Sequence, residues 1–257
     1  MLATIKHKAL HAAMVLSVVL LAACGSLPQG DATLPAESSA WVGRVADAAA
    51  GSRWHHYRLP GKQATQFEYA RKDGRDVLAV KAESSASMLR RKLRIAPADL
   101  GNVRFSWKVP QLIADADMAT RDGDDSPVRI ILAFEGDRAR LSAKDAMLSE
   151  LALALTGEEM PYATLMYVWC NKREPGSVIT SARTGRVRAI VMESGTRKLD
   201  QWLDYERNIR ADYQRAFGEA PGALIGIAVM TDSDNTQSTA RAWYGPVSLG
   251  PSPAKQR

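Results

Sequence analysis

Cysteine and histidine are scarce in this sequence, and their scarcity excludes several kinds of chemistry. The 257 residues include two cysteines and four histidines, and only His55 and His56 lie beyond residue 23. Adjacent side chains in a strand point to opposite faces, so these histidines cannot readily act together. No H-E-x-x-H, C-x-x-C or G-x-S-x-G motif occurs. A zinc site and a serine-hydrolase site therefore have little sequence support.

A long apolar run is also lacking near the N-terminus, where residues 12–21 are too few to cross a bilayer. Lys6 and Lys8 precede this run and small residues follow it, which is typical of a secretion signal. The tetrapeptide LAAC resembles the lipobox of bacterial lipoproteins, which implies cleavage before Cys24 and its acylation. We expect residues 1–23 to be a lipoprotein signal peptide and Cys24 to be the lipidation site. An ordinary signal peptide with a chance cysteine is the alternative.

Charge and cysteine usage bear on location and partners. The formal net charge falls from +6 to +4 once Lys6 and Lys8 leave with the signal peptide, so no nucleic acid partner is needed to explain it. An acylated Cys24 leaves Cys170 without a disulfide partner, and we interpret Cys170 as a buried small apolar residue. Glycine rather than aspartate follows Cys24, which by the same resemblance favours the outer membrane. The predicted location is the bacterial cell envelope, lipid-anchored to the outer membrane and facing the periplasm.

Composition divides the remaining chain into three parts. Residues 25–40 mix Gly, Pro and Ser with scattered acids and show no apolar period. We therefore expect residues 24–40, with the acylated cysteine, to form a flexible tether. Residues 41–249 are predicted to form one β-sandwich domain, and residues 250–257 a disordered tail.

Short runs rich in Val, Ile, Phe, Tyr and Trp recur from residue 41 onward, each about as long as a strand. In VRIILAF, residues 128–134, the even-numbered residues share one side of a strand and the odd-numbered residues share the other. Helices do not alternate regularly with these runs, which argues against βαβ units. The predicted fold class is all-β, with antiparallel sheets stacked into a sandwich and one or two packed helices.

Two segments have helical spacing instead. The first, residues 143–157, ends at Gly157, and its apolar positions are Met147, Leu148, Leu151, Ala152 and Leu155. The second, residues 200–218, ends at Gly218, and its stripe is Trp202, Tyr205, Ile209, Tyr213 and Ala216. Glu206 and Arg210 would pair on this second helix. We expect its stripe to pack on a sheet, with a partner-binding role as the alternative.

Acidic side chains gather in two segments that could carry chemistry. They are Asp115, Asp117, Asp122, Asp124 and Asp125 in the first and Asp232 and Asp234 in the second. Glycan hydrolysis needs two carboxylates across a bond, so an alternative enzyme would use Asp124 or Asp125 with Asp232. A solvated loop is the simpler interpretation. Calcium is a minor hypothesis because both segments fail the EF-hand template, and no cofactor is predicted.

The loop from Thr231 to Thr239 joins an apolar strand to the aromatic run ARAWYG. Its acids, amide and hydroxyls can hydrogen-bond their own backbone, so alone it would be only a turn. Aromatic and amide residues in neighbouring runs make a binding role for this loop more plausible. Flat aromatic rings can pack on the apolar faces of a sugar ring, and nearby polar groups can bind its hydroxyls. Aromatic residues in strands are nevertheless usually part of the core.

Five ordered segments resemble the bacterial secreted family known as domain of unknown function 3047. They are DDSPVRIILAFEGD (124–137), LMYVWCN (165–171), RVRAIVMESG (186–195), ERNIRADYQRAFGEAP (206–221) and IGIAVMTDSDNTQSTARAWYG (225–245). The resemblance implies a concanavalin-like jelly roll and no established activity. It adds Arg207 to the polar motif residues. Cys170 stands where alanine is expected and Pro246 where an acid is expected, which weakens any ligand role at the start of the last strand.

The leading hypothesis is a non-catalytic binding module for glycan or another envelope polymer. Its predicted ligand-binding residues are Asp124, Asp125, Arg129, Tyr167, Trp169, Asn171, Arg188, Asp232, Asp234, Asn235, Trp243 and Tyr244. The alternatives are the glycan-active enzyme with its aspartate pair and a factor that assembles envelope proteins. The membrane, through the lipid anchor, is the remaining predicted partner.

Overall fold

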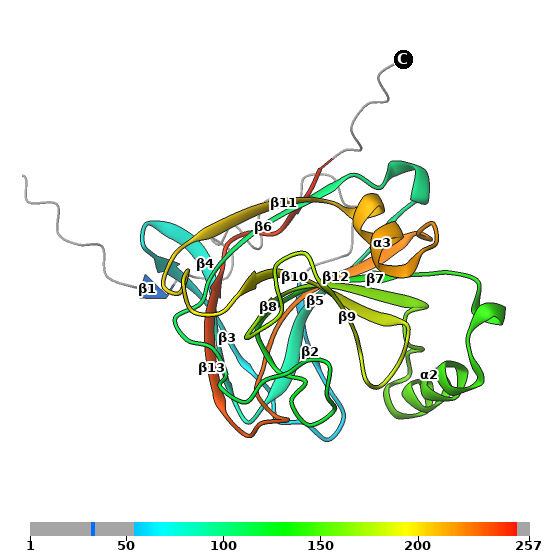
Figure 1. Cartoon of the computed structure of the whole chain (residues 1–257), viewed down its shortest axis with the longest axis horizontal. Coiled ribbons are helices and arrows are strands. Elements are labelled where there is room, and N and C mark those ends of the chain that lie inside the picture. The colour runs from blue at the N-terminus through cyan, green and yellow to red at the C-terminus, as the bar shows by residue number, and fades with distance from the viewer. Residues whose placement is uncertain (1–31, 34–53, 251–257) are drawn as a thin grey trace, which may run out of the picture.

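The computed structural model describes residues 32–33 and 54–250, which fold into two stacked seven-stranded sheets (Figure 1). The predicted signal peptide, the lipidation site at Cys24 and the tail beyond residue 250 lie outside the described residues, as does the tether apart from its residues 32–33. None of the helices in the described ranges is long and apolar enough to cross a membrane. The all-β sandwich predicted from the apolar runs is confirmed.

The two sheets differ in the order in which the chain visits them. Sheet A contains, in spatial order, β1 (Ala32–Thr33), β3 (Gln66–Lys72), β4 (Arg75–Glu83), β13 (Thr239–Tyr244), β6 (Asn102–Lys108) and β11 (Leu203–Asn208), and β14 (Ser248–Leu249) also pairs with β6. Sheet B contains β2 (His55–Arg58), β5 (Ala86–Ile95), β12 (Leu224–Asp232), β7 (Ser126–Phe134), β8 (Ala163–Cys170), β10 (Val187–Ser194) and β9 (Val178–Thr180). Every pairing is antiparallel except that of β8 with β10, which departs from the purely antiparallel expectation.

The core lies between the facing sides of the sheets and follows the period of two. In β7 the even-numbered residues from Val128 to Phe134, which were predicted to share one side of a strand, are all completely buried in this core. Phe105 of β6 stacks against Tyr167 of β8 with ring centroids 5.4 Å apart, which joins the two sheets through aromatic contact. The unpaired thiol of Cys170 is buried, so the interpretation of this residue as a small apolar side chain is confirmed.

The second predicted helix is only half right. Residues 203–208 form β11, which pairs residue by residue with β6, and the helix α3 (Ile209–Phe217) begins after it. Glu206 accordingly pairs with Arg104 across the strands rather than with Arg210. Hydrogen bonding along the edge of β6 outweighs helical propensity here, since a strand beside a free edge satisfies its backbone. The stripe on α3 packs into the core, so it offers no face to a partner.

The first predicted helix is confirmed as α2 (Ala143–Thr156), with Ser142 capping its start and Gly157 in the left-handed conformation at its end. Its packing is not what the apolar spacing predicts. Ser149 is its only buried residue, whereas Leu151 and Leu155 are 54% and 64% exposed. Figure 1 shows α2 set apart from the two sheets, on the side of sheet B. The apolar side chains of this helix therefore lie outside the core.

Candidate functional site

The two acidic segments meet, as the ligand-binding hypothesis requires. Asn235 donates its backbone N–H to Asp125 Oδ1 at 3.2 Å and its side-chain amide to the carbonyl of Asp124 at 2.8 Å. Thr236 donates its N–H and hydroxyl to Asp125 Oδ2 at 2.7 and 2.6 Å. We call this group the acid–amide cluster, and its members are Asp124, Asp125, Arg129, Asp232, Asp234 and Asn235.

Asp232 forms a buried ion pair with Arg129 at the centre of the cluster. Arg129 Nε and Nη2 each lie 2.8 Å from one of its carboxylate oxygens, and the N–H of Ser126 donates to the same group at 3.1 Å. Burial raises the pKa of Asp232, and the charge of Arg129 opposes this rise. A raised pKa suits a general acid, but Asp232 is only 3% exposed and both its oxygens already accept hydrogen bonds. A substrate has no path to this carboxyl group.

A metal ion would have to compete with these internal partners. Asp125, Asp232 and Asp234 each offer an oxygen, and these atoms lie within 4.8 Å of one another. However, Asp232 is bound to Arg129, and Asp234 is bound to Lys62. Two cations thus already neutralise charge at the position where calcium would bind, and the cluster is built as a structural clasp between β7 and the loop after β12.

The aromatic part of the predicted site lies in the core. Tyr167, Trp169 and Tyr244 are at most 1% exposed, and the hydroxyl of Tyr244 donates to the carbonyl of Met230 at 2.6 Å. Trp243 is half-buried on sheet A, where the Lys72 ammonium lies 4.9 Å from its ring centre. These rings present no shared surface to a sugar. The loops converge as expected, but the three buried rings, Tyr167, Trp169 and Tyr244, do not line a hollow between them.

The remaining predicted residues also hold the fold together. Asn171 donates its amide to the carbonyls of Ile113 and Ala116, at 2.6 and 3.1 Å. Arg188 donates to the carbonyl of Ala216 at the end of α3. The family motif residue Arg207 binds the carboxylate of Asp212 through two nitrogens, and Asp212 also accepts from Tyr167 at 2.9 Å. The contacts of Asn171 and Arg188 hold a loop and α3 against sheet B, and those of Asp212 join α3 to β11 and β8.

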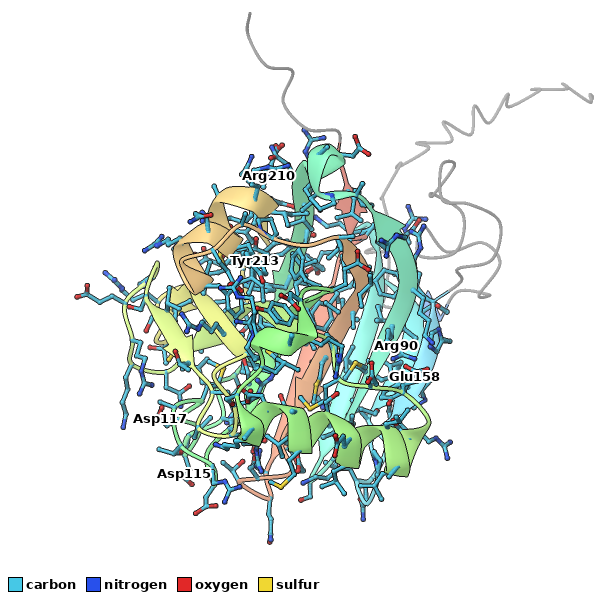
Figure 2. The ribbon with its side chains drawn as sticks, turned by 90° about the vertical axis from the view of Figure 1, so that its right-hand side faces the viewer. Arg90, Asp115, Asp117, Glu158, Arg210 and Tyr213 are labelled. Carbon is cyan, nitrogen blue, oxygen red and sulfur yellow. The ribbon has the colours of Figure 1, made fainter. Side chains whose placement is uncertain are left out.

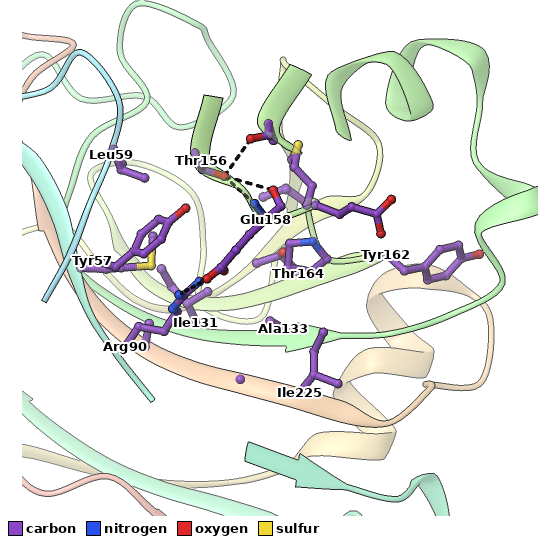
Figure 3. Close-up of a pocket in the computed structure, with 18 of the residues that line it drawn as sticks. Tyr57, Leu59, Arg90, Ile131, Ala133, Thr156, Glu158, Tyr162, Thr164 and Ile225 are labelled. Carbon is purple, nitrogen blue, oxygen red and sulfur yellow. Dashed lines mark hydrogen bonds and ion pairs between the residues drawn. The ribbon is translucent and has the colours of Figure 1, made fainter. Parts of the chain in front are cut away.

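A cavity of about 1020 Å³ lies elsewhere, between α2 and the outer face of sheet B (Figure 3). We call it the α2 cleft. Its floor is formed by outward-pointing side chains of four adjacent strands, which are Met88, Ile131, Met166, Ala228 and Met230. Its roof is formed by side chains of α2, which are Leu148, Leu151, Ala152 and Leu155.

Sequence reasoning missed this cleft, although the sequence carries a signal for it. In the run LMYVWC of β8 and in residues 227–230 of β12, apolar residues occupy both sides of the strand. An antiparallel sheet with one side facing water normally alternates apolar and polar residues. Apolar residues on both sides therefore indicate that something covers the outer face.

A charged group closes one end of the cleft. Arg90 binds both oxygens of Glu158 at 2.7 and 3.1 Å, and Lys92 binds the same carboxylate at 2.7 Å. Figure 2 shows Arg90 and Glu158 lying together near one end of α2. Hydrogen bonds from Arg90 and Lys92 lower the pKa of Glu158 to about 2. Glu158 therefore stays ionised at neutral pH and serves as a tie rather than as a proton donor.

The model of the family described as protein of unknown function DUF3047 matches residues 52–248. The chain belongs to this family. No curated protein matches it. The DUF3047 fold is similar to that of a thermostable cellulase derived from Cel12A of Rhodothermus marinus, with 10% identity, 77% of this chain and 96% of that chain covered, and a TM-score of 0.42. It is also similar to the xyloglucanase domain of NopAA from Sinorhizobium fredii in complex with cellobiose, with 8% identity, 80% and 96% coverage, and a TM-score of 0.40.

The chemistry available to the DUF3047 chain is decided by its own side chains. Among the aspartates of the predicted pair, Asp124 and Asp232 are bound to Arg129, and Asp125 is buried and accepts hydrogen bonds from Thr236. The lining of the α2 cleft includes the carboxylates Glu135, Glu158 and Glu159, each of which forms an ion pair with an arginine. Neither place holds two free carboxylates facing across an open space, as glycoside hydrolysis requires.

Proposed function

We propose that this DUF3047 protein is a non-catalytic binding module of the bacterial cell envelope, held to a membrane through acylated Cys24. Its ligand occupies the α2 cleft. The observation that carries the proposal is an apolar cavity of about 1020 Å³ between a helix and a sheet of the same chain. Ligand sites are usually pre-formed, mostly apolar hollows of about 300–1,000 Å³, so the cleft has the size and lining of such a site.

Three features support binding over catalysis. The acids predicted as a catalytic pair are engaged with internal donors, and the histidines His55 and His56 lie on the edge strand β2. Glu158 is held ionised by two cations. A binding module needs none of these groups to be reactive. A glycan or another envelope polymer was the ligand predicted from the sequence, and it remains one arm of the test below.

The anchor is tested with Cys24→Ser and with Cys170→Ser as the matched control. We expect the protein with native Cys24 to incorporate labelled palmitate and to sediment with the outer membrane. The Cys24→Ser variant should lose the label, whereas Cys170→Ser should keep it, because the thiol of Cys170 is buried in the fold. Label retained by Cys24→Ser would overturn Cys24 as the lipidation site, and absence of label from the wild type would overturn the lipid anchor itself.

Ligand binding is tested by amide hydrogen exchange of α2. The chain from residue 25 retains every described residue and carries no acyl group. We expect α2 amides to exchange slowly only when one envelope fraction is added, because a ligand beneath the helix would hold it against sheet B. The fractions are peptidoglycan fragments, exopolysaccharide and a lipid extract, each added separately. Exchange unchanged by all three would overturn the assignment of the cleft as a ligand site.

A further inference from the structure

We infer that the ligand of the α2 cleft is the fatty acyl chain of an envelope amphiphile. This inference rests on the proposed binding function and names the chemical class of its ligand. It is argued from the floor of the cleft, from its roof and from the charges at its edges.

The floor is a continuous apolar surface because apolar residues are neighbours across the strands. In one row Ala228 of β12 pairs with Ile131 of β7, which pairs with Met166 of β8. In the next row Met230 pairs with Met88 of β5. These side chains point away from the core of the sandwich and form a separate apolar cluster. Methionine is flexible and polarizable, and surfaces rich in it adapt to apolar ligands of irregular shape.

The roof presents apolar side chains that the described residues leave uncovered. Leu148, Leu151 and Leu155 line the cleft, and Leu151 and Leu155 remain more than half exposed. Apolar surface left in water is unfavourable in proportion to its area. An apolar ligand between these leucines and the floor would remove both surfaces from water at once. Binding would thus supply packing for Leu151 and Leu155, which the described residues leave exposed.

The charges around the cleft do not favour a polar ligand. The six charged side chains of the lining are all in ion pairs: Arg90, Lys92, Glu135, Arg138, Glu158 and Glu159. A sugar in the cleft would compete with these ion pairs for hydrogen bonds, and any of its hydroxyl groups buried without a partner would weaken binding. A hydrocarbon chain has no groups that need hydrogen-bond partners.

The ties at the ends of α2 favour a thin ligand over a folded partner. Thr184 Oγ1 donates to Asp145 Oδ1 in the first turn at 2.5 Å, and Arg90 and Lys92 hold Glu158 just beyond the last turn. The side chain of Ser149 accepts from the N–H of Met160 at 3.2 Å in between. A helix fixed at both ends over a sheet leaves a slot. A flexible chain can enter a slot, whereas a protein helix about 10–12 Å wide cannot enter without displacing α2.

The experiment uses the chain from residue 25 and the fluorescent fatty acid 11-(dansylamino)undecanoic acid. We expect saturable binding that palmitate displaces and that cello-oligosaccharides do not. Two alanines of α2 provide a matched pair of variants. Ala152 lines the cleft, whereas Ala154 is exposed and does not line it. Ala152→Trp should weaken binding at least tenfold by filling the space, and Ala154→Trp should change it less than twofold.

The outcomes separate this inference from the proposed function. Absence of fatty acid binding, or equal binding by both tryptophan variants, overturns the acyl-chain inference. If peptidoglycan or exopolysaccharide then slows exchange in α2, the binding function stands with a different ligand. If no fraction slows exchange, both fail. Should Ala152→Trp fold poorly, Leu151→Asp provides the second variant, because a carboxylate on the roof repels an acyl chain without filling the cleft.

Discussion

Arg129 and Asp232 form a buried, two-pronged ion pair between two central strands of sheet B, with both nitrogen–oxygen distances at 2.8 Å. Arg129 lies on β7 and Asp232 ends β12, so the pair locks these strands where their regular register breaks. Arg129 also donates to the carbonyl of Asp124 at 2.8 Å, which joins the neighbouring loop to the same group. Attraction to Asp232 and Asp124 raises the pKa of Arg129 even though burial alone would lower it.

Removing one partner of this pair should cost far more than removing a surface arginine. We expect Arg129→Met to lower the free energy of unfolding by about 3–5 kcal/mol, because it leaves the Asp232 carboxylate buried without its partner. Arg75→Met is the control, since Arg75 and Asp204 form an exposed pair worth about 1 kcal/mol or less. Urea unfolding monitored by tryptophan fluorescence measures both. Equal losses would show that the buried pair does not hold the strands together.

The indole of Trp169 should matter for folding rather than for contact with a ligand. It is 1% exposed, and its Nε1 donates to the carbonyl of Gly195 at 3.0 Å. Trp169→Ala should therefore destabilise the fold by about 3–5 kcal/mol. The half-buried Trp243 is the comparison, and Trp243→Ala should cost less than half as much. A Trp169→Ala protein that unfolds like the wild type yet loses an envelope ligand would restore the ligand-binding role predicted from the sequence.

Acid should loosen the tie at the end of α2. Glu158 has its pKa lowered from 4.5 to about 2 by hydrogen bonds from Arg90 and Lys92. Its stabilising contribution is therefore fully present above about pH 4.5 and is lost as the pH falls toward 2. Urea unfolding of wild type and Glu158→Gln, compared at a series of pH values, checks this. The wild type should be the more stable at pH 6, and the difference should shrink toward pH 2; a constant difference would contradict the assigned role of this carboxylate.

A methyl group should be tolerated at one glycine and not at another. A Cβ on Gly222 would collide with the backbone carbonyl of Glu135, which belongs to a neighbouring segment and cannot turn away. Gly222→Ala should thus cost at least about 1–3 kcal/mol, the range measured for overpacking. Gly185 has no atom within 4 Å of its Cβ position, so Gly185→Ala should be neutral or slightly stabilising. Thermal unfolding of the pair tests the close approach of the segment before β12 to that after β7.

Local patterns predicted most of the fold because alternate residues of a strand point to opposite sides of the sheet, so the alternation of apolar and polar residues reveals the strand. The alternation in β7 predicted a strand with two distinct sides, and the glycine after each helix marked where α2 and α3 end. The second helix was predicted too long because residues 202–209 carry apolar residues at a spacing that a strand can also use. Only the free edge of β6, contributed by residues 96 to 106 positions earlier, decides between the two.

The candidate site was harder to predict because side-chain type does not report which side of a sheet is covered. Aspartates, an asparagine and tryptophans are the residue types expected at a sugar site, and the structure does bring Asp124, Asp125 and Asn235 together. It also supplies Arg129, whose charge turns the acids into an internal network. The α2 cleft, in contrast, is lined by methionine, leucine, isoleucine and alanine, which sequence reasoning assigns to the core.

The sequence by itself determined that this chain forms stacked sheets, where most strands lie, that α2 and α3 end at Gly157 and Gly218, and that Cys170 is a buried apolar residue. These properties follow from the periodic spacing of apolar residues and from helix capping. Both depend only on residues close together in the sequence. The tertiary structure alone decided that Asp232 meets Arg129, that residues 203–208 pair with β6, and that α2 stands over an apolar face of sheet B instead of packing into the core. Such contacts join segments distant in sequence, and their energy depends on burial and distance, which no single segment of the chain encodes.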